Sequence, residues 1–207
     1  RPDTIFGATY LVMAPEHPLV AALVTEPQRA AVLAYQQRTA SRSELDRQAD
    51  KVKTGVATGA HAENPATGEP IPIWIADYVI YGYGTGAIMA VPAHDERDHA
   101  FARVMALPIV EVITGGNVQD AAYCDDGTMV RSGPFDGTPT EHGVAKQRIT
   151  RWLEERGAGR AVVTYKMRDW IFARQRYWGE PIPVLKRDGA VVRALTEAEL
   201  PVILPEV

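Results

Sequence analysis

The apolar segments of this 207-residue chain are short, and proline or glycine interrupts the sequence around most of them. Strand-forming residues gather in three of these segments, at 9–14, 71–78 and 87–91. Apolar periodicity predicts helices in three others, at 19–38 with a break near Pro27, at 95–106 and at 140–156. Short strands with interspersed helices favour an α+β fold around a mixed or closed sheet, and the chain contains no internal repeat.

Finer features add detail to this prediction. Pro72 lacks a backbone N–H, so the strand at 71–78 is expected at a sheet edge or beside a bulge. Residues 108–113 and 161–165 are predicted as further strands. Thr140 is predicted as the N-cap of the helix that follows it.

Composition places the chain among globular proteins. Hydrophobic residues make up 46% of it and charged residues 23%, values that do not suggest disorder. No apolar run is long enough to span a bilayer, and the N-terminus lacks the basic and apolar regions of a signal peptide. Cys124 is the only cysteine, which excludes an internal disulfide and a Cys-based zinc site within the chain. The chain also begins without Met, so we expect a piece of a longer, cytoplasmic protein.

The charge is unevenly distributed along the chain. The net charge is −4, which argues against a generic nucleic-acid coat, yet residues 144–187 contain eleven Lys and Arg against four acids. Such a basic flank, of about +7 on an acidic body, can hold a phosphodiester chain. The same pattern is also typical of a solvated helix face, so charge alone leaves both interpretations open.

The densest group of ionisable residues lies at 94–99, with the sequence His-Asp-Glu-Arg-Asp-His. Zinc-binding helices place two histidines four residues apart, whereas His94 and His99 are five apart, roughly 140° around a helix. Pairing of His94 with Asp98, or of Asp95 with His99, leaves a mixed metal site open. Asp95 and Asp98 share a helix face, and Asp95 is equally well placed to cap the helix N-terminus.

A glycine-containing segment precedes this group. Three glycines lie between 82 and 86, but the Lys-Ser/Thr of a nucleotide-binding P-loop does not follow them. Met89 and Val91 lie on one face of the predicted strand at 87–91, so they would form an apolar wall if that face borders a cleft. The chain start, Arg1–Thr4, combines a cation, an anion and a hydroxyl on a stiff turn. A Thr side chain beside a small pocket would occupy the space that a branched side chain needs.

Several segments together resemble the editing domain of leucyl-tRNA synthetases of the bacterial type, the insertion called the connective polypeptide. They are Arg1–Thr4, Thr54–Val56 with Thr58-Gly59, Asn64-Pro65, Ile71–Tyr78, Gly84–Asp98, and Arg168–Trp170 through Arg174–Gly179 to Pro181–Pro183. Their order is that of the family, and they cover nearly the whole chain. Isoleucyl and valyl relatives carry Trp in place of Asp3 and lack the run from Met89 to Asp98, so the resemblance is specific to the leucyl family.

The resemblance implies a fold, a domain boundary and an activity. The expected fold is α+β, with an antiparallel or mixed β-barrel-like sheet core flanked by helices, as in editing domains of class I aminoacyl-tRNA synthetases. Residues 1–165 would form the editing domain. Residues 166–207 would form linker strands that return to the synthetase core and the start of a leucine-specific insertion. The expected activity is post-transfer editing, the hydrolysis of the ester that joins norvaline, isoleucine or methionine to tRNA-Leu.

The family also implies roles for individual residues. Thr4 is expected to exclude leucine, and Asp98 to hold the α-ammonium of the substrate, which makes these two the predicted catalytic residues. Substrate-binding residues are expected at seven positions: Arg1, Asp3, Tyr83, Met89, Val91, Asp95 and Arg97. Water is expected as the nucleophile, without a covalent enzyme intermediate, because no Ser-His-Asp or Cys-His set is evident.

Cofactors and partners follow from the same resemblance. No metal or cofactor is expected, and ATP would serve only the full-length synthetase, because the signatures of the aminoacylation core are absent from this chain. The expected partners are the 3′ end of tRNA-Leu, with its terminal adenosine, and the rest of the synthetase, with no membrane. Two alternatives remain open: a non-catalytic tRNA-docking module that uses the basic flank, and a metal-dependent hydrolase built on residues 94–99.

Overall fold

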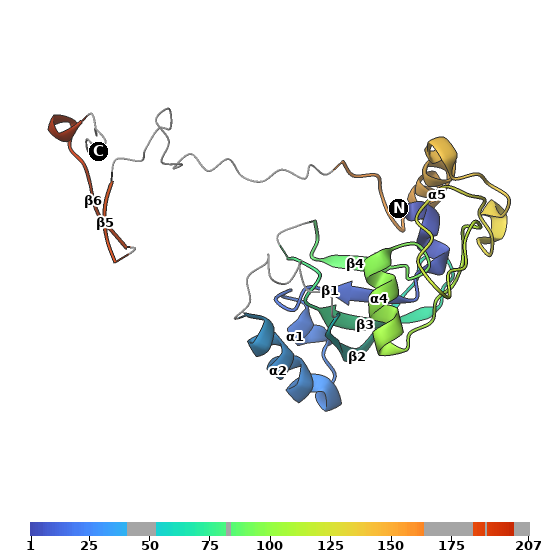
Figure 1. Cartoon of the computed structure of the whole chain (residues 1–207), viewed down its shortest axis with the longest axis horizontal. Helices are drawn as coiled ribbons and strands as arrows, with labels where there is room; N and C mark the ends of the chain where they lie inside the picture. The colour runs from blue at the N-terminus through green and yellow to red at the C-terminus, as the bar shows by residue number, and fades with distance from the viewer. Residues whose placement is uncertain (41–52, 82–83, 164–183, 189, 201–207) are drawn as a thin grey trace. The chain divides into compact units, whose positions relative to one another are not determined.

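The computed structural model describes residues 1–40, 53–81, 84–163, 184–188 and 190–200. The chain divides into two compact units, Arg1–Thr164 and Tyr165–Val207. The first unit contains the sheet and most of the helices (Figure 1). The roles predicted for residues 1–165 and 166–207 remain predictions, because nothing in either unit's fold reports what it does.

A four-stranded mixed sheet forms the centre of the first unit. Its strands are β1 (Tyr10–Met13), β2 (Gly55–Glu63), β3 (Pro70–Ala76) and β4 (Ala87–Ala90), in the order β2-β3-β1-β4. β1 runs parallel to β3 and antiparallel to β4, while β2 is antiparallel to β3. This sheet with its flanking helices confirms the mixed α+β class.

The barrel-like closure expected for the sheet is not found in the described residues. The strand order leaves β2 and β4 at the two edges, so the sheet is open. Residues 107–140, which would have to extend it, contribute only two isolated bridges, Ile113 with Met129 and Thr128 with Pro139. The predicted strand at 108–113 is accordingly wrong. The backbone N–H groups of Val112 and Ile113 donate to a histidine side chain instead of to a neighbouring strand.

Pro72 lies in β3, an interior strand, and of the two environments predicted for it, a sheet edge or a bulge, the structure shows the bulge. The register of β2 against β3 shifts between Ala57 and His61, and His61 is the partner of Pro72. On the other side, the pairing of β1 with β3 begins at Ile73. The missing N–H of Pro72 therefore falls outside the β1 ladder and beside the bulge in β2.

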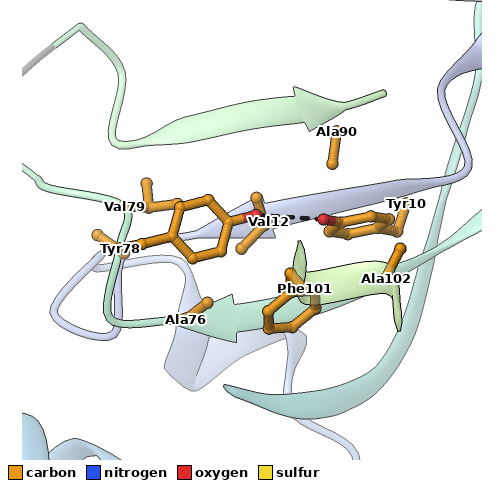
Figure 2. Packing of buried hydrophobic residues seen from close by; sticks show 9 residues of the cluster. Tyr10, Val12, Ala76, Tyr78, Val79, Ala90, Phe101 and Ala102 are labelled. Carbon is orange, nitrogen blue, oxygen red and sulfur yellow. Dashed lines mark hydrogen bonds between the residues drawn. The ribbon is translucent and has the colours of Figure 1, made fainter. Parts of the chain in front are cut away.

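Helices cover both faces of the sheet (Figure 1). On one face lies α4 (Glu96–Met105), whose Phe101 and Ala102 pack with Tyr10 and Val12 of β1 (Figure 2). On the other face, α1 (Val20–Leu23) and α2 (Arg29–Ala40) pack against the alternate residues of β1 and β3. The short 3-10 turn η2 (Glu26–Gln28) separates these two helices and contains Pro27, which confirms the predicted break.

Phe101 is fully buried at the centre of the α4 face, with its ring 5.4 Å from that of Tyr10 and 5.6 Å from that of Trp74. We expect Phe101→Ala to lower the free energy of unfolding by about 3–5 kcal/mol, because it removes a large side chain that leaves a cavity. Denaturant titration measures this change. Val104→Ala on the same helix is the control, since Val104 is 59% exposed and should cost within about 0.5 kcal/mol. Equal losses for the two variants would contradict this assignment of the core.

A third packing cluster joins the chain start to the last helix of the unit. Ile5, in the 3-10 helix η1 (Pro2–Gly7), packs with Ile149 and Leu153 of α5 (Val144–Glu155). The short turns η3 (Gly133–Phe135) and η4 (Glu141–Gly143) precede α5. The first unit thus contains a cluster that is separate from the two on the sheet.

Thr140 does not cap α5, which corrects the sequence prediction. Its hydroxyl donates to Asp126 Oδ1 at 2.9 Å and accepts from the N–H of Gly127 at 2.9 Å. The N-cap position of α5 belongs to Gly143, in a left-handed conformation with φ of 71°. The helix therefore begins later than predicted, and Thr140 instead links two loops.

The second unit contains a hairpin of β5 (Val184–Arg187) and β6 (Ala190–Ala194), followed by η5 (Glu197–Glu199). Of the predicted strand at 161–165, residues 161–163 have no regular structure and the rest lies outside the described residues, as does the motif at 168–183. None of the helices in the described part of the chain has the length and apolar character needed to cross a membrane.

Candidate active site

A cavity of about 350 Å³ lies in the first unit, where η1, the end of β4 and the start of α4 meet. Seven of the nine predicted site residues line it: Arg1, Thr4, Met89, Val91, Asp95, Arg97 and Asp98. Asp3 lies outside the lining, and Tyr83 lies outside the described residues. Ile88 and His94 complete the wall, and neither was predicted as a pocket residue.

The turn between β4 and α4 brings Asp98 back beside the strand end. The N–H groups of His94 and Asp95 both donate to the carbonyl oxygen of Val91, at 2.9 and 3.1 Å. Asp95 then caps α4, since its carboxylate accepts from the N–H groups of Arg97 and Asp98. Pro92 follows Val91 and cannot continue a ladder, so the strand ends and the helix begins within a few residues.

Asp98 is buried, with 4% of its surface exposed, and both of its carboxyl oxygens accept hydrogen bonds. Oδ2 accepts from the N–H of Val91 and Oδ1 from the hydroxyl of Tyr78, each at 2.9 Å. Burial, followed by the charge of Asp95, raises the pKa of Asp98 to about 6. The cavity therefore contains a carboxyl group that changes its charge near neutral pH.

Asp95 has the N-cap geometry that the sequence left open, and it also lines the cavity. Its Oδ2 lies 3.1 Å from an Arg97 guanidinium nitrogen. Burial raises the pKa of Asp95, but the hydrogen bond and charge of Arg97 outweigh this effect, so the pKa lies below its ordinary value. Asp95 is thus an ionised neighbour of Asp98, and its role toward a substrate stays a prediction.

Thr4 is buried in η1, with 2% of its surface exposed. Its hydroxyl donates to the carbonyl oxygen of Arg1 at 2.9 Å. A hydroxyl has one proton, and that proton is used on the backbone. Thr4 therefore contributes volume to the cavity wall and no free hydrogen-bond donor.

Arg1 lines the cavity and is held there by Asp3, which lies outside the lining. Asp3 Oδ2 accepts from two nitrogens of the Arg1 guanidinium, at 2.8 and 3.1 Å, and is buried. A third contact runs from Arg1 to the carbonyl oxygen of Cys124 at 3.1 Å. Asp3 thus fixes a cation at the cavity, and the predicted direct contact of Asp3 with substrate stays a prediction.

His94 joins three chain segments through its ring. Its Nε2 accepts from the N–H groups of Val112 and Ile113, both at 3.1 Å. The proton must therefore reside on Nδ1, which donates to the carbonyl oxygen of Tyr123 at 2.8 Å. Burial lowers the pKa of His94, which favours the same neutral form.

The metal interpretation of residues 94–99 has no support in this geometry. A metal ligand needs a free ring nitrogen, and both nitrogens of His94 already have backbone partners. Across the described residues, no three His, Cys, Asp or Glu side chains form a group that could hold a metal ion.

Comparison with known proteins assigns the family. Residues 1–154 match the family described as leucyl-tRNA synthetase, editing domain. The chain belongs to this family. It is 54% identical, over 222 aligned residues, to the leucine–tRNA ligase of Mycobacterium marinum (strain ATCC BAA-535 / M), a match that covers 100% of this chain and 22% of the relative. The resemblance inferred from the motifs is therefore confirmed.

A solved structure supports the same family. The chain is similar to the agnB2 LeuRS of Agrobacterium radiobacter K84, solved as a ternary complex with tRNA and LeuAMS, with a TM-score of 0.59 and 30% identity. This match covers 98% of the chain and 22% of that LeuRS. The chain thus spans about a fifth of the length of the relatives it matches.

Proposed function

We propose that this chain is the proofreading part of a leucine–tRNA ligase and hydrolyses the aminoacyl ester of mischarged tRNA-Leu. The observation that carries the proposal is that Thr4, near the start of the matched segment, and Asp98, in its interior, line one cavity. The first supplies volume and the second a negative charge. A site that rejects one side chain while holding an α-ammonium needs these two properties together.

The proposed mechanism is hydrolysis by water. The Asp98 carboxylate binds the substrate's α-ammonium in a charge-assisted pair, which fixes the ester carbonyl. A water molecule adds to the carbonyl carbon, the bond from carbon to the ribose oxygen breaks, and that oxygen takes a proton as the free amino acid leaves. The neighbouring free ribose hydroxyl assists. Met89 and Val91 contact the amino-acid side chain, and Arg97 orders Asp95 beside them.

In this proposal the wall of the cavity determines which aminoacyl esters are hydrolysed. A synthetic pocket discriminates near-isosteres by only about 1–3 kcal/mol per methylene, so norvaline, isoleucine and methionine are charged by mistake. Thr4 excludes the branched side chain of leucine, and the correct product escapes hydrolysis. The reaction requires no ATP, metal or other cofactor.

The proposed partners are the terminal adenosine at the 3′ end of tRNA-Leu and the rest of the synthetase, acting in the cytoplasm. The relative from Agrobacterium was solved with tRNA, which supports the first partner. The basic side chains Lys146, Arg148 and Arg151 are exposed on α5 and are suited to a phosphodiester chain. Binding by this flank should therefore weaken as salt concentration rises.

Side-by-side deacylation of norvalyl-tRNA-Leu and leucyl-tRNA-Leu tests the proposal, with the chain measured in the full-length ligase. We expect rapid hydrolysis of the norvalyl ester and sparing of the leucyl ester. Addition of a chelator should leave the rate unchanged. Binding of tRNA without hydrolysis would favour a docking module, and loss of hydrolysis in chelator would favour a metal-dependent enzyme.

Deacylation should depend on pH through Asp98. The free enzyme's pKa for this group, about 6, governs the acid limb of kcat/KM. Because the carboxyl is neutral below that pH and cannot pair with an ammonium, kcat/KM should rise through pH 6 and level off near pH 7. The rates are measured from pH 5 to 7 and corrected for uncatalysed hydrolysis. In this pH range the α-amino group of the substrate stays mostly protonated. A flat profile over this range would contradict the assigned role.

A further inference from the structure

Two buried tyrosines form hydrogen bonds with Asp98, and neither has a role in the proposed function. Tyr10 lies on β1 and Tyr78 in the turn after β3, with 0% and 7% of their surfaces exposed. Their hydroxyl oxygens lie 3.2 Å apart and point toward each other (Figure 2). Neither residue lines the cavity, so the pair contacts Asp98 from the core.

The proton positions in this group follow from its geometry. The hydroxyl of Tyr78 donates its one proton to Asp98 Oδ1 at 2.9 Å. The one proton of the Tyr10 hydroxyl is then shared between the Tyr78 hydroxyl oxygen at 3.2 Å and the backbone carbonyl oxygen of Asp98 at 3.3 Å. Burial raises the pKa of both phenols well above the ordinary value, which keeps these donors protonated.

The hydrogen bond from Tyr78 limits how the carboxylate can turn. An ionised carboxylate has about four acceptor positions, of which the Tyr78 hydroxyl and the Val91 N–H use two. These two donors hold different oxygens, so the plane of the carboxylate is fixed. The remaining acceptor positions are left for a group in the cavity.

We propose that Tyr78 is a positioning residue, which fixes the Asp98 carboxylate so that its remaining acceptor positions face an ammonium group in the cavity. The inference rests on the proposed function, because it gives Asp98 the task of holding the α-ammonium. Tyr78 touches no substrate in this arrangement and acts through Asp98 alone.

The charges around Asp98 support this role for Tyr78. In the described part of the chain, the ionisable groups near the carboxyl or its tyrosine support include Asp95, Arg97, Arg1, His94, Tyr10, and Lys53, whose Nζ lies 5.7 Å from the Tyr78 ring centre. Burial and Asp95 favour the neutral acid, whereas the hydrogen bonds from Val91 and Tyr78 and the charge of Arg97 lower the pKa of Asp98. Loss of the Tyr78 donor should therefore raise that pKa.

Tyr78→Phe tests the proposal with little change of shape. The ring of Tyr78 lies 5.7 Å from that of Phe101 and should stay packed without its hydroxyl. Titration of the ¹³C-labelled Asp98 carboxyl by NMR measures its pKa directly on this chain. We expect the pKa to rise by about one unit in Tyr78→Phe. Tyr10→Phe is the matched control, because it removes a hydroxyl from the same core without a bond to a carboxyl oxygen, and its shift should be smaller.

The kinetic readout separates positioning from folding. In Tyr78→Phe ligase, kcat/KM for norvalyl-tRNA-Leu should fall about five-fold at pH 6 and recover to within about two-fold at pH 7.5, as the acid limb moves up. An unmoved NMR pKa, a shift in Tyr10→Phe as large as that in Tyr78→Phe, or a uniform loss at every pH would overturn the proposal. A raised pKa in a ligase that deacylates nothing would overturn the proposed function while the Tyr78–Asp98 coupling stands.

Discussion

Asp98→Ala should reduce kcat/KM for the deacylation of norvalyl-tRNA-Leu by about 100-fold or more. A hydrogen bond to a charged group contributes about 1.5–3 kcal/mol, and the loss of orientation at the ester adds to that. Each 1.36 kcal/mol of lost transition-state stabilisation slows the reaction about ten-fold. The measurement is the initial rate of deacylation by the full-length ligase that carries the substitution.

Two further variants make this prediction specific. Asp98→Asn keeps the shape of the side chain but removes its charge, so it should lose activity even where Asp98→Ala also perturbs folding. Asp120→Ala is the matched control, because Asp120 is exposed and lies outside the cavity. Thermal unfolding of all three proteins reports on their folding. If Asp98→Asn deacylates at the parent rate, the ammonium-binding role of Asp98 is wrong.

Thr4→Ala should convert the domain into one that hydrolyses correctly charged leucyl-tRNA-Leu. The substitution removes the methyl and hydroxyl groups that make Thr4 part of the cavity wall. Because a methyl-sized difference in a pocket is worth about 1–3 kcal/mol, leucyl-tRNA-Leu hydrolysis should rise by about 10- to 200-fold. Hydrolysis of the norvalyl ester should change little, since the smaller side chain already fits.

An isosteric variant distinguishes volume from hydrogen bonding at this position. Thr4→Val keeps the branched shape but removes the donor to the carbonyl oxygen of Arg1. A steric block predicts that Thr4→Val still spares leucine. Admission of leucine by Thr4→Val to the same extent as by Thr4→Ala would show that the hydrogen bond is what matters. Continued sparing of leucine by Thr4→Ala would refute the block altogether.

Local signals in the sequence predicted the elements that local physics controls. The apolar run around β1 and the break at Pro27 each depend on residues within one or two turns, and each is found in the structure, as is the cap at Asp95 that the sequence left open. For Pro72 the sequence predicted either a sheet edge or a bulge, because a single strand does not reveal its neighbours. Only the pairing with His61 shows how a bulge accommodates this proline inside the sheet.

The same distinction between local signals and long-range contacts applies to the candidate site. The motifs and their resemblance to the family predicted seven of its lining residues, since each lies in a contiguous matching segment. A metal-ligand role for His94 stayed open because its partners, at Val112 and Tyr123, are backbone groups that leave no trace in side-chain patterns. Tyr78 reads as the end of an apolar strand, and nothing in its neighbours indicates a hydrogen bond to a helix twenty residues later.

The two walls of the cavity rest on different hydrophobic clusters. Thr4 belongs to η1, whose Ile5 packs with α5, while Asp98 belongs to α4, whose Phe101 packs on the sheet. In the proposed function, exclusion of leucine by Thr4 and binding of the ammonium by Asp98 therefore depend on different parts of the core. We expect substitutions in the cluster beneath η1, at Ile149 for example, to affect which amino acid is rejected more than they affect ammonium binding. Deacylation of leucyl- and norvalyl-tRNA-Leu by such variants would show whether the two properties can be changed separately.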